Sequence, residues 1–261
     1  LVSLGGPWLT FALNAVSFAG VIVVLLLWKR QVQEPLLPAE RFVGAIRTGL
    51  RFARSSKPLQ AVLIRALAFF FCASAGMSLL PLIVRGEMHG SAADFGMLLA
   101  AIGIGAVGGA TLLPRLREKI SRDRLVAVAS LLYALFLLAL ALTRNFYALL
   151  PAMLLSGAAW IAVLSNLQVA AQTSVPAWVR ARALSVYILV FFGAMAAGSL
   201  LWGSLASHAS ITLSLLLAAG GLALGTLLTI KVALPSTEVE ELTPSLHWPT
   251  PLLSDDLDRD S

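Results

Sequence analysis

Residues 125–143 read LVAVASLLYALFLLALALT, a run of 19 positions without a charged side chain. Arg122, Asp123 and Arg124 precede this run, and Arg144 follows it. A helix rises about 1.5 Å per residue, so about 20 apolar residues cross the hydrocarbon core of a bilayer. Backbone polar groups find no water there, and a helix satisfies them internally. The run therefore predicts a transmembrane helix.

Six more uncharged, apolar runs of similar length are present. They cover residues 8–28, 66–84, 95–114, 146–168, 183–207 and 211–230. Apolar residues make up 59% of the 261 residues and charged residues 12%, against about 45–50% and about 25% in soluble domains. We therefore predict an all-α fold, a polytopic membrane helical bundle of seven spans.

Lys and Arg collect in alternate connections between the runs. The first connection and the third are rich in them, whereas the second and fourth have only Arg85 and Arg144. Cytoplasmic loops carry such an excess. We therefore expect a multi-pass protein of the plasma (inner) membrane, with the first residue outside and the C-terminus in the cytoplasm. The topology signals of the later loops are Arg115, Arg117, Lys119, Arg180 and Arg182.

The net charge of +6 has the same explanation, because the positive residues lie in short loops beside apolar runs. We read the charge as a topology signal, not as a nucleic-acid footprint, and expect no nucleic-acid partner. The lipid bilayer is the expected partner.

The first connection contains an amphipathic pattern. Apolar residues fall on one helical face (Phe42, Ile46, Leu50 and Ala53), and basic residues share another (Arg47, Arg51 and Arg54). One interpretation is a short basic helix that lies along the membrane surface. The other is a solvated linker helix whose charges only fix the topology.

The two ends of the sequence differ from the runs. From Leu234 onward, four prolines and seven acidic residues accompany few apolar ones, which predicts a disordered cytoplasmic tail. The sequence begins at Leu1 and enters an uncharged run without the basic region or cleavage site of a signal peptide. We expect it to be a fragment that an N-terminal part precedes.

Polar and aromatic side chains concentrate in the second, fifth and sixth runs. Asn166 and Gln168 are costly in hydrocarbon, so they face either a water-filled cavity or the cytoplasmic interface. Phe70, Ser74 and Met77 share one helical face, which either accepts a bulky amphipathic substrate or packs on a neighbouring helix. The candidates for a substrate cavity are Phe70, Ser74, Met77, Trp160, Asn166, Tyr187 and Phe191.

Glycine pairs in the third and seventh runs have the spacing that lets helix backbones approach closely. They are Gly105 with Gly109 and Gly221 with Gly225. This pattern predicts helix packing and identifies no substrate.

The sequence lacks the usual signatures of an enzyme. It has no His-Glu-x-x-His pair and no phosphate-binding Gly-x-x-x-x-Gly-Lys run. The single cysteine, Cys72, excludes a cysteine metal cluster, and we expect neither a metal nor another cofactor. No Asp or Glu lies inside any run, although proton-coupled carriers usually bind the proton at such a group.

Four local patterns together resemble the major facilitator superfamily, and within it the transmembrane secretion effector group, which includes enterobactin exporters. The patterns are FFFCASAGMSLLP at 69–81, LPRLR at 113–117, QTSVPAWVRARA at 172–183 and WGSLA at 202–206. The resemblance implies twelve helices in two halves, with these seven runs as helices six to twelve. It also implies a central cavity lined by the second, third, fifth and sixth runs.

The resemblance divides the chain into four parts. Residues 1–28 would end the N-terminal half, 29–57 would form the cytoplasmic loop between the halves, 58–233 the C-terminal half and 234–261 the tail. The superfamily's loop pattern, Gly-x-x-x-Asp-Arg-x-Gly-Arg-Arg, is only partly kept. Aligned from Gly109, Leu113 stands in the Asp place and Arg117 alone keeps its charge, so we do not expect that pattern's gating salt bridge here.

The sequence is consistent with two functions. One is a secondary transporter that exports small amphipathic molecules of the siderophore or drug type by alternating access, with proton coupling. Its partners are the small-molecule substrate and the N-terminal half that this sequence lacks. The other is a membrane scaffold or sensor that transports nothing.

Overall fold

The computed structural model describes residues 2–28, 42–176, 179–229 and 234. These residues form helices and contain no strand. The elements are α1 (Val2–Leu27), α2 (Phe42–Ser55), α3 (Lys57–Leu82), the π-helical turn η1 (Ile83–Glu87), α4 (Ala92–Lys119), α5 (Arg122–Leu142), α6 (Phe146–Thr173), α7 (Arg180–His208) and α8 (Ile211–Thr229). Seven of these helices are long and apolar enough to cross a membrane, which confirms the predicted class of fold.

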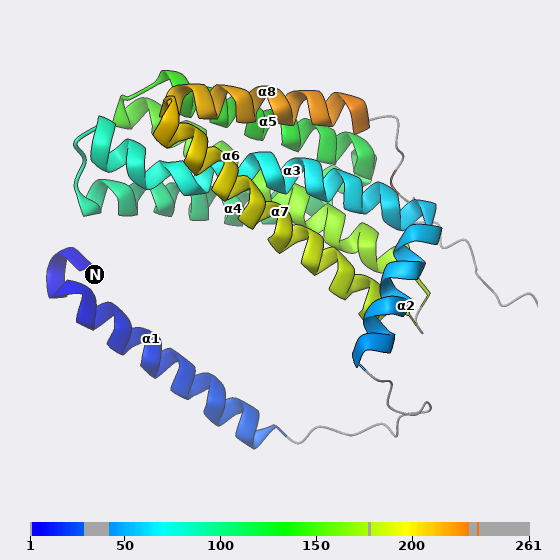
Figure 1. Cartoon of the computed structure of the whole chain (residues 1–261). Coiled ribbons are helices and arrows are strands. Elements are labelled where there is room, and N and C mark those ends of the chain that lie inside the picture. The colour runs from blue at the N-terminus through cyan, green and yellow to red at the C-terminus, as the bar shows by residue number, and fades with distance from the viewer. Residues whose placement is uncertain (1, 29–41, 177–178, 230–233, 235–261) are drawn as a thin grey trace, which may run out of the picture.

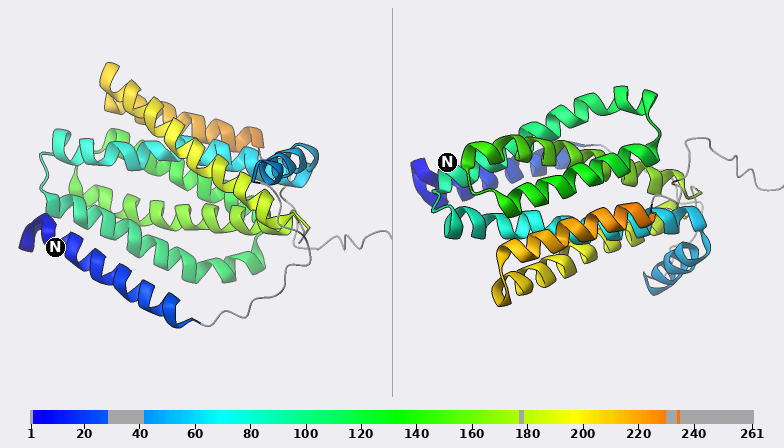
Figure 2. Two further views of the ribbon diagram at one scale, coloured as in Figure 1. Left: turned by 60° about the horizontal axis from the view of Figure 1, so that its bottom comes forward. Right: turned by 90° about the horizontal axis from the view of Figure 1, so that it is seen from above.

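Helices α3 to α8 pack into one bundle in which successive helices run in opposite directions (Figure 1). Helix α5 packs on α6 and α8, while α3 lies between α7 and α8, and α4 packs on α6. The two further views show the same arrangement (Figure 2). Helix α1 lies mostly apart from the bundle and touches α4, and none of its residues from Trp8 to Leu27 is buried.

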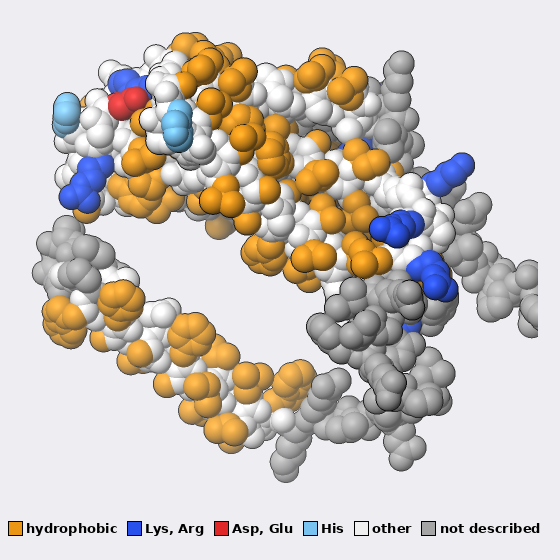
Figure 3. Space-filling view, viewed as in Figure 1, with side chains coloured by type: hydrophobic (Ala, Val, Ile, Leu, Met, Phe, Trp, Pro, Cys, Tyr) orange, Lys and Arg blue, Asp and Glu red, His pale blue; other side chains and the backbone are white. Residues whose placement is uncertain are grey.

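The bundle has two chemically different ends. At one end, helices α3, α5 and α7 begin and helices α4, α6 and α8 end. We call it the basic end, because residues 115–124 contribute five Lys and Arg side chains there. The other, the far end, carries Arg85, Glu87 and Arg144. In Figure 3 a wide apolar surface (orange) separates Lys and Arg side chains (blue) on the right from a group of basic, acidic and histidine side chains on the left.

Side-chain caps begin several helices. The Ser56 hydroxyl accepts a hydrogen bond from the Leu59 amide, and α3 begins at Lys57, well before the run at 66–84. The Asn145 side chain likewise accepts from the amides of Tyr147 and Ala148 at 2.9 and 3.2 Å. Such caps satisfy the otherwise unpaired amides of a first helical turn.

Glycine brings α4 and α6 into backbone contact. A Cβ atom on Gly105 would lie 1.9 Å from the carbonyl oxygen of Leu154, and one on Gly157 would lie 1.9 Å from that of Ile102. Helix α7 approaches α3 in the same way, because a Cβ on Gly198 would lie 2.2 Å from a carbonyl oxygen of α3. Close packing at the predicted Gly105 pair is therefore confirmed. At Gly221 the nearest atom would be 3.3 Å away, so the seventh run packs less closely.

Helix α2 lies in the first connection, where the sequence predicts an amphipathic helix. Its Ala53 is buried with Val179, Ala183 and Val186 at the start of α7, while Arg51 and Arg54 are exposed. The rest of the connection up to residue 41 and the predicted tail from residue 235 lie outside the described residues.

Candidate functional site

An aromatic layer crosses the middle of the bundle. Phe70 of α3 lies 5.5 Å from Trp160 of α6 and 4.4 Å from Phe191 of α7, measured between ring centroids. Tyr133 of α5 lies 5.4 Å from Phe69 and 5.9 Å from Trp160. Edge-to-face pairs of this kind add about 0.5–1.5 kcal/mol each beyond the area they bury. The layer therefore fixes four helices against one another.

The edge of the aromatic layer reaches the surface. Phe70 is fully buried, whereas Trp160 and Phe191 are only partly buried. Met77, two turns beyond Phe70 on α3, exposes 46% of its surface. Of the predicted cavity residues, Trp160, Phe191 and Met77 therefore have surface that is exposed outside the bundle.

An open apolar groove of about 300 Å³ lies between α3 and α7. Gly193 leaves room in it, because a Cβ atom there would meet nothing within 4 Å. Pockets for drug-sized molecules start at about 300 Å³ and are mostly apolar. The lining residues are Leu63, Ile64, Leu67, Val190, Gly193 and Ala194. None of them was singled out from the sequence, because apolar side chains in an apolar run carry no distinguishing signal.

Two other predicted cavity residues are buried within the bundle. Ser74 has no exposed surface, and its hydroxyl donates to the Phe71 carbonyl at 2.7 Å where Gly198 of α7 approaches. Tyr187 exposes only 4% of its surface. Together with Phe70, they are buried, whereas Trp160, Phe191 and Met77 keep exposed surface.

Asn166 is held by the protein at the basic end. Its side-chain oxygen accepts a hydrogen bond from Nε of Arg117 at 3.1 Å, and its amide nitrogen donates to the Ala162 carbonyl at 2.7 Å. A second Arg117 nitrogen donates to the Ser165 hydroxyl at 2.8 Å. Arg117 thus joins the end of α4 to α6 through neutral partners, whereas the sequence pointed to a cavity or to interfacial water around Asn166.

The remaining predicted basic residues lie near the same end. Arg115, Lys119 and Arg180 are exposed, and Arg182 is partly buried. Arg122 donates to the Thr173 hydroxyl at 3.5 Å, a long contact between α5 and α6.

Sequence reasoning missed a buried ion pair at this end. Arg65 exposes 4% of its side chain and lies 2.8 Å from the carboxylate of Asp123 at the start of α5. Arg65 also donates to the Thr229 carbonyl of α8 at 3.0 Å, and the same Asp123 oxygen accepts from the Leu234 amide at 2.9 Å. Arg65 lies two turns inside α3, and this position was the available signal that it does more than set the topology.

A second ion pair at the far end joins η1, the end of α5 and α8. Arg144 pairs with Glu87, and another of its nitrogens donates to the Leu140 carbonyl at 2.7 Å. It also donates to the Thr212 hydroxyl at 3.1 Å. Arg65 at the basic end and Arg144 at the far end therefore join α5 and α8 to the two ends of the segment formed by α3 and η1. We call these two groups of contacts the polar clasps.

Among the described residues, no three His, Cys, Asp or Glu side chains come together as metal ligands. In the described part of the chain, the arrangement consists of an apolar groove with aromatic edges on one face and polar clasps at both ends. Such a surface can bind an amphipathic molecule by burial and gives it no anchoring charge.

The sequence was compared with known proteins and protein families. A search of curated proteins finds no match. A family described as Transmembrane secretion effector matches residues 1–261, the whole of the sequence. Together with the seven apolar helices, this match indicates a membrane transporter of the major facilitator type. The chain belongs to the transmembrane secretion effector family.

Proposed function

We propose that this protein exports small amphipathic molecules of the siderophore or drug type by alternating access. The observation that carries the proposal is the open groove between α3 and α7, with its apolar lining and neighbouring aromatic edges. Apolar walls hold many shapes of molecule through burial alone, and Met77 adds an exposed, flexible side chain further along α3. We assign a supporting role behind this wall to the buried residues Phe70, Ser74 and Tyr187.

The proposal gives the chain an orientation and a partner. The basic end lies in the cytoplasm of a plasma membrane, because Lys and Arg accumulate on that side. Residues 58–233 act as the C-terminal half, and residues 29–57 connect it to an N-terminal half that completes the cavity. The sparse contact of α1 with the bundle supports its assignment to that other half.

Proton coupling is the proposed energy source. Among the described carboxylates, Glu87 and Asp94 lie at the far end, and Glu118 and Asp123 lie at the basic end. Because a coupling proton needs a titratable group along the pathway, we place that group in the N-terminal half. A protonophore should then raise substrate accumulation in cells that express the full-length protein.

The groove is tested by filling it. Gly193→Phe places a ring where a Cβ meets nothing, and Gly220→Phe makes the same change on an open position of α8, away from the groove. In the full-length protein, Gly193→Phe should bring accumulation of an exported siderophore or drug close to that of cells without the transporter. Gly220→Phe should leave export as in the wild type.

Two results would contradict the proposal. Equal export by both, at equal amounts in the membrane, would remove the groove from the pathway. Failure of the wild type to lower accumulation of any substrate in the panel would contradict the export proposal itself.

A further inference from the structure

Helix α2 crosses one end of the bundle. Figure 1 shows α2 running across the direction of α3, at the basic end where α3 and α7 begin. A Cβ atom on Gly49 of α2 would lie 3.0 Å from the Arg182 carbonyl oxygen, so the backbones of α2 and α7 are close. Only Ser56 separates α2 from α3, and the Gln60 side chain donates a hydrogen bond to the Arg54 carbonyl. In a bilayer that α3 and α7 cross, α2 therefore lies along the membrane surface, at the level of the lipid headgroups.

The exposed face of α2 is cationic. Ala53 is buried against α7, whereas Arg51 and Arg54 are exposed one turn apart. Lys57, the first residue of α3, is exposed as well, and Leu50 exposes 38% of its surface beside Arg51. We call Arg51, Arg54 and Lys57 the α2 patch. Exposed cations and an exposed apolar side chain on one helix are typical of a membrane surface.

The α2 patch has no acidic neighbour among the described residues. The sequence contains no Asp or Glu from position 41 to 86 or from 124 to 237, and these ranges cover α2, α3, α6, α7 and α8. In the described part of the chain, none of the three patch side chains forms an ion pair. Like charges one turn apart on a helix repel each other. An anion bound among them would remove that repulsion.

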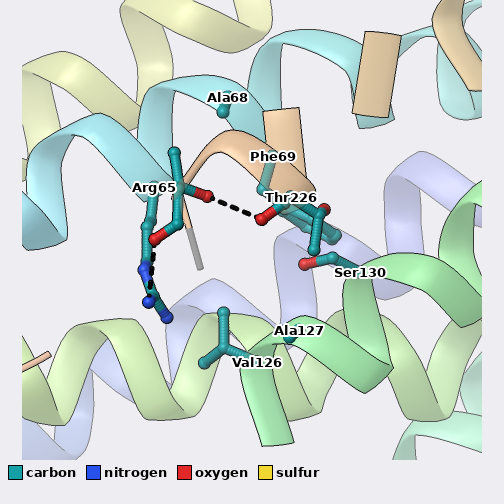
Figure 4. A pocket seen from close by; sticks show the side chains of 8 residues that line it. Arg65, Ala68, Phe69, Val126, Ala127, Ser130 and Thr226 are labelled. Atoms are coloured by element: carbon teal, nitrogen blue, oxygen red, sulfur yellow. Dashed lines mark hydrogen bonds between the residues drawn. The ribbon is translucent and has the colours of Figure 1, made fainter. Parts of the chain in front are cut away.

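Other cations at the basic end have partners within the protein. Figure 4 shows Arg65 inside the bundle close to Thr226 of α8, and its guanidinium lies 2.8 Å from the carboxylate of Asp123. Arg117 donates hydrogen bonds to two side chains of α6. The five Lys and Arg of residues 115–124 are also interspersed with two acidic residues. Among the described residues, the α2 patch has neither kind of partner.

Lipid phosphate is the anion that this position favours. Arginine can donate two parallel hydrogen bonds to a phosphate group, and lysine adds a compact positive charge. Basic residues just outside a membrane span attract anionic headgroups, and each Lys or Arg adds to the affinity. The exposed side chain of Leu50 offers an apolar contact that a lipid chain can use and a free phosphate ion cannot.

We propose that the α2 patch binds the phosphate headgroup of an anionic lipid in the leaflet beside the basic end. Arg51 and Arg54 hold the phosphate, Lys57 adds a third positive charge, and Leu50 contacts the lipid chain. The proposal rests on the membrane-spanning fold and is independent of the substrate and of the direction of transport.

Native mass spectrometry of the full-length protein tests the site, with phosphatidylglycerol or phosphatidylcholine added to the micelles. Arg51→Gln with Arg54→Gln removes two cations from the patch, and Arg115→Gln with Lys119→Gln removes two exposed cations from the end of α4 as the matched control. We expect the wild type and the control to prefer phosphatidylglycerol, and the affinity of the patch variant for it to fall about tenfold or more. Equal losses in both double variants, or equal binding of the two lipids by the wild type, would overturn the proposal.

Two further measurements distinguish the lipid from other anions. Phosphatidylglycerol should raise the midpoint of thermal unfolding of the wild type, and inorganic phosphate should leave it unchanged. Neutralising part of the acidic segment after Leu234 should leave the affinity for phosphatidylglycerol unchanged; the changes are Glu240→Gln, Glu241→Gln, Asp255→Asn and Asp256→Asn. An equal rise with inorganic phosphate would assign the patch to a free anion. A several-fold gain in lipid affinity in the neutralised variant would assign it to the acidic segment, and either result would overturn the proposal.

Discussion

The α4/α6 pair and the group formed by α3, α5 and α8 are held together by different chemistry. Two glycines bring the backbones of α4 and α6 into contact, with no room for a Cβ atom at either position. In the other group, side-chain contacts from Arg65 and Arg144 join the helices at opposite ends. In a bilayer, where burial of apolar surface drives helix association weakly, both devices replace the hydrophobic core of a soluble protein. The first depends on shape alone, and the second depends on charge.

The largest effect should come from breaking the shape-dependent contact. Gly157→Leu puts a side chain where a Cβ would lie 1.9 Å from the Ile102 carbonyl oxygen, so α4 and α6 must separate. We expect a loss of more than about 4 kcal/mol in the free energy of unfolding, or no folded protein in detergent.

Gly103→Leu is the control for that change. A Cβ at Gly103 meets nothing within 4 Å, so the same substitution on α4 should leave stability nearly unchanged. Similar yields and unfolding midpoints for the two variants would refute the close α4/α6 contact.

A smaller effect should follow from breaking the buried ion pair. Asp123→Leu leaves the Arg65 guanidinium buried without its carboxylate and should cost about 3 kcal/mol in the free energy of unfolding. The double variant Arg65→Leu, Asp123→Leu should recover most of that loss, because no lone charge remains. Strictly additive losses, measured by denaturant titration in micelles, would show that the pair does not couple α3 to α5.

The smallest effect concerns a neutral hydrogen bond between α5 and α3. The Tyr133 hydroxyl donates to the Ala73 carbonyl at 3.2 Å, and Tyr133→Phe removes only this donor. We expect a cost of about 1 kcal/mol in the free energy of unfolding. An unchanged unfolding midpoint would mean that the aromatic rings alone hold these helices together.

The seven spans could be predicted because hydrocarbon length and charge exclusion act on every residue of a run. The helix ends were less predictable, since α3 begins at Lys57 through the Ser56 cap, outside its apolar run. Caps act through one or two polar side chains that hydropathy does not register.

The candidate site was less predictable for a related reason. Helical spacing places Phe70 and Ser74 on one face but does not say whether that face meets a neighbouring helix or open space. The structure buries both, while the groove nearby is lined by residues such as Leu67 and Gly193 that look ordinary in the sequence. The Arg65–Asp123 pair joins residues far apart in the chain, and no local sequence pattern predicts it.

Thiol accessibility tests most directly whether the groove faces a water-filled pathway. In a full-length Cys72→Ala background, single cysteines replace Leu67 or Gly193 in the groove, and Leu224 on the exposed surface of α8. A membrane-impermeant, water-soluble thiol reagent should label the two groove positions in open membranes and spare position 224, which lipid covers. Labelling of position 224 with no labelling at positions 67 and 193 would contradict the account.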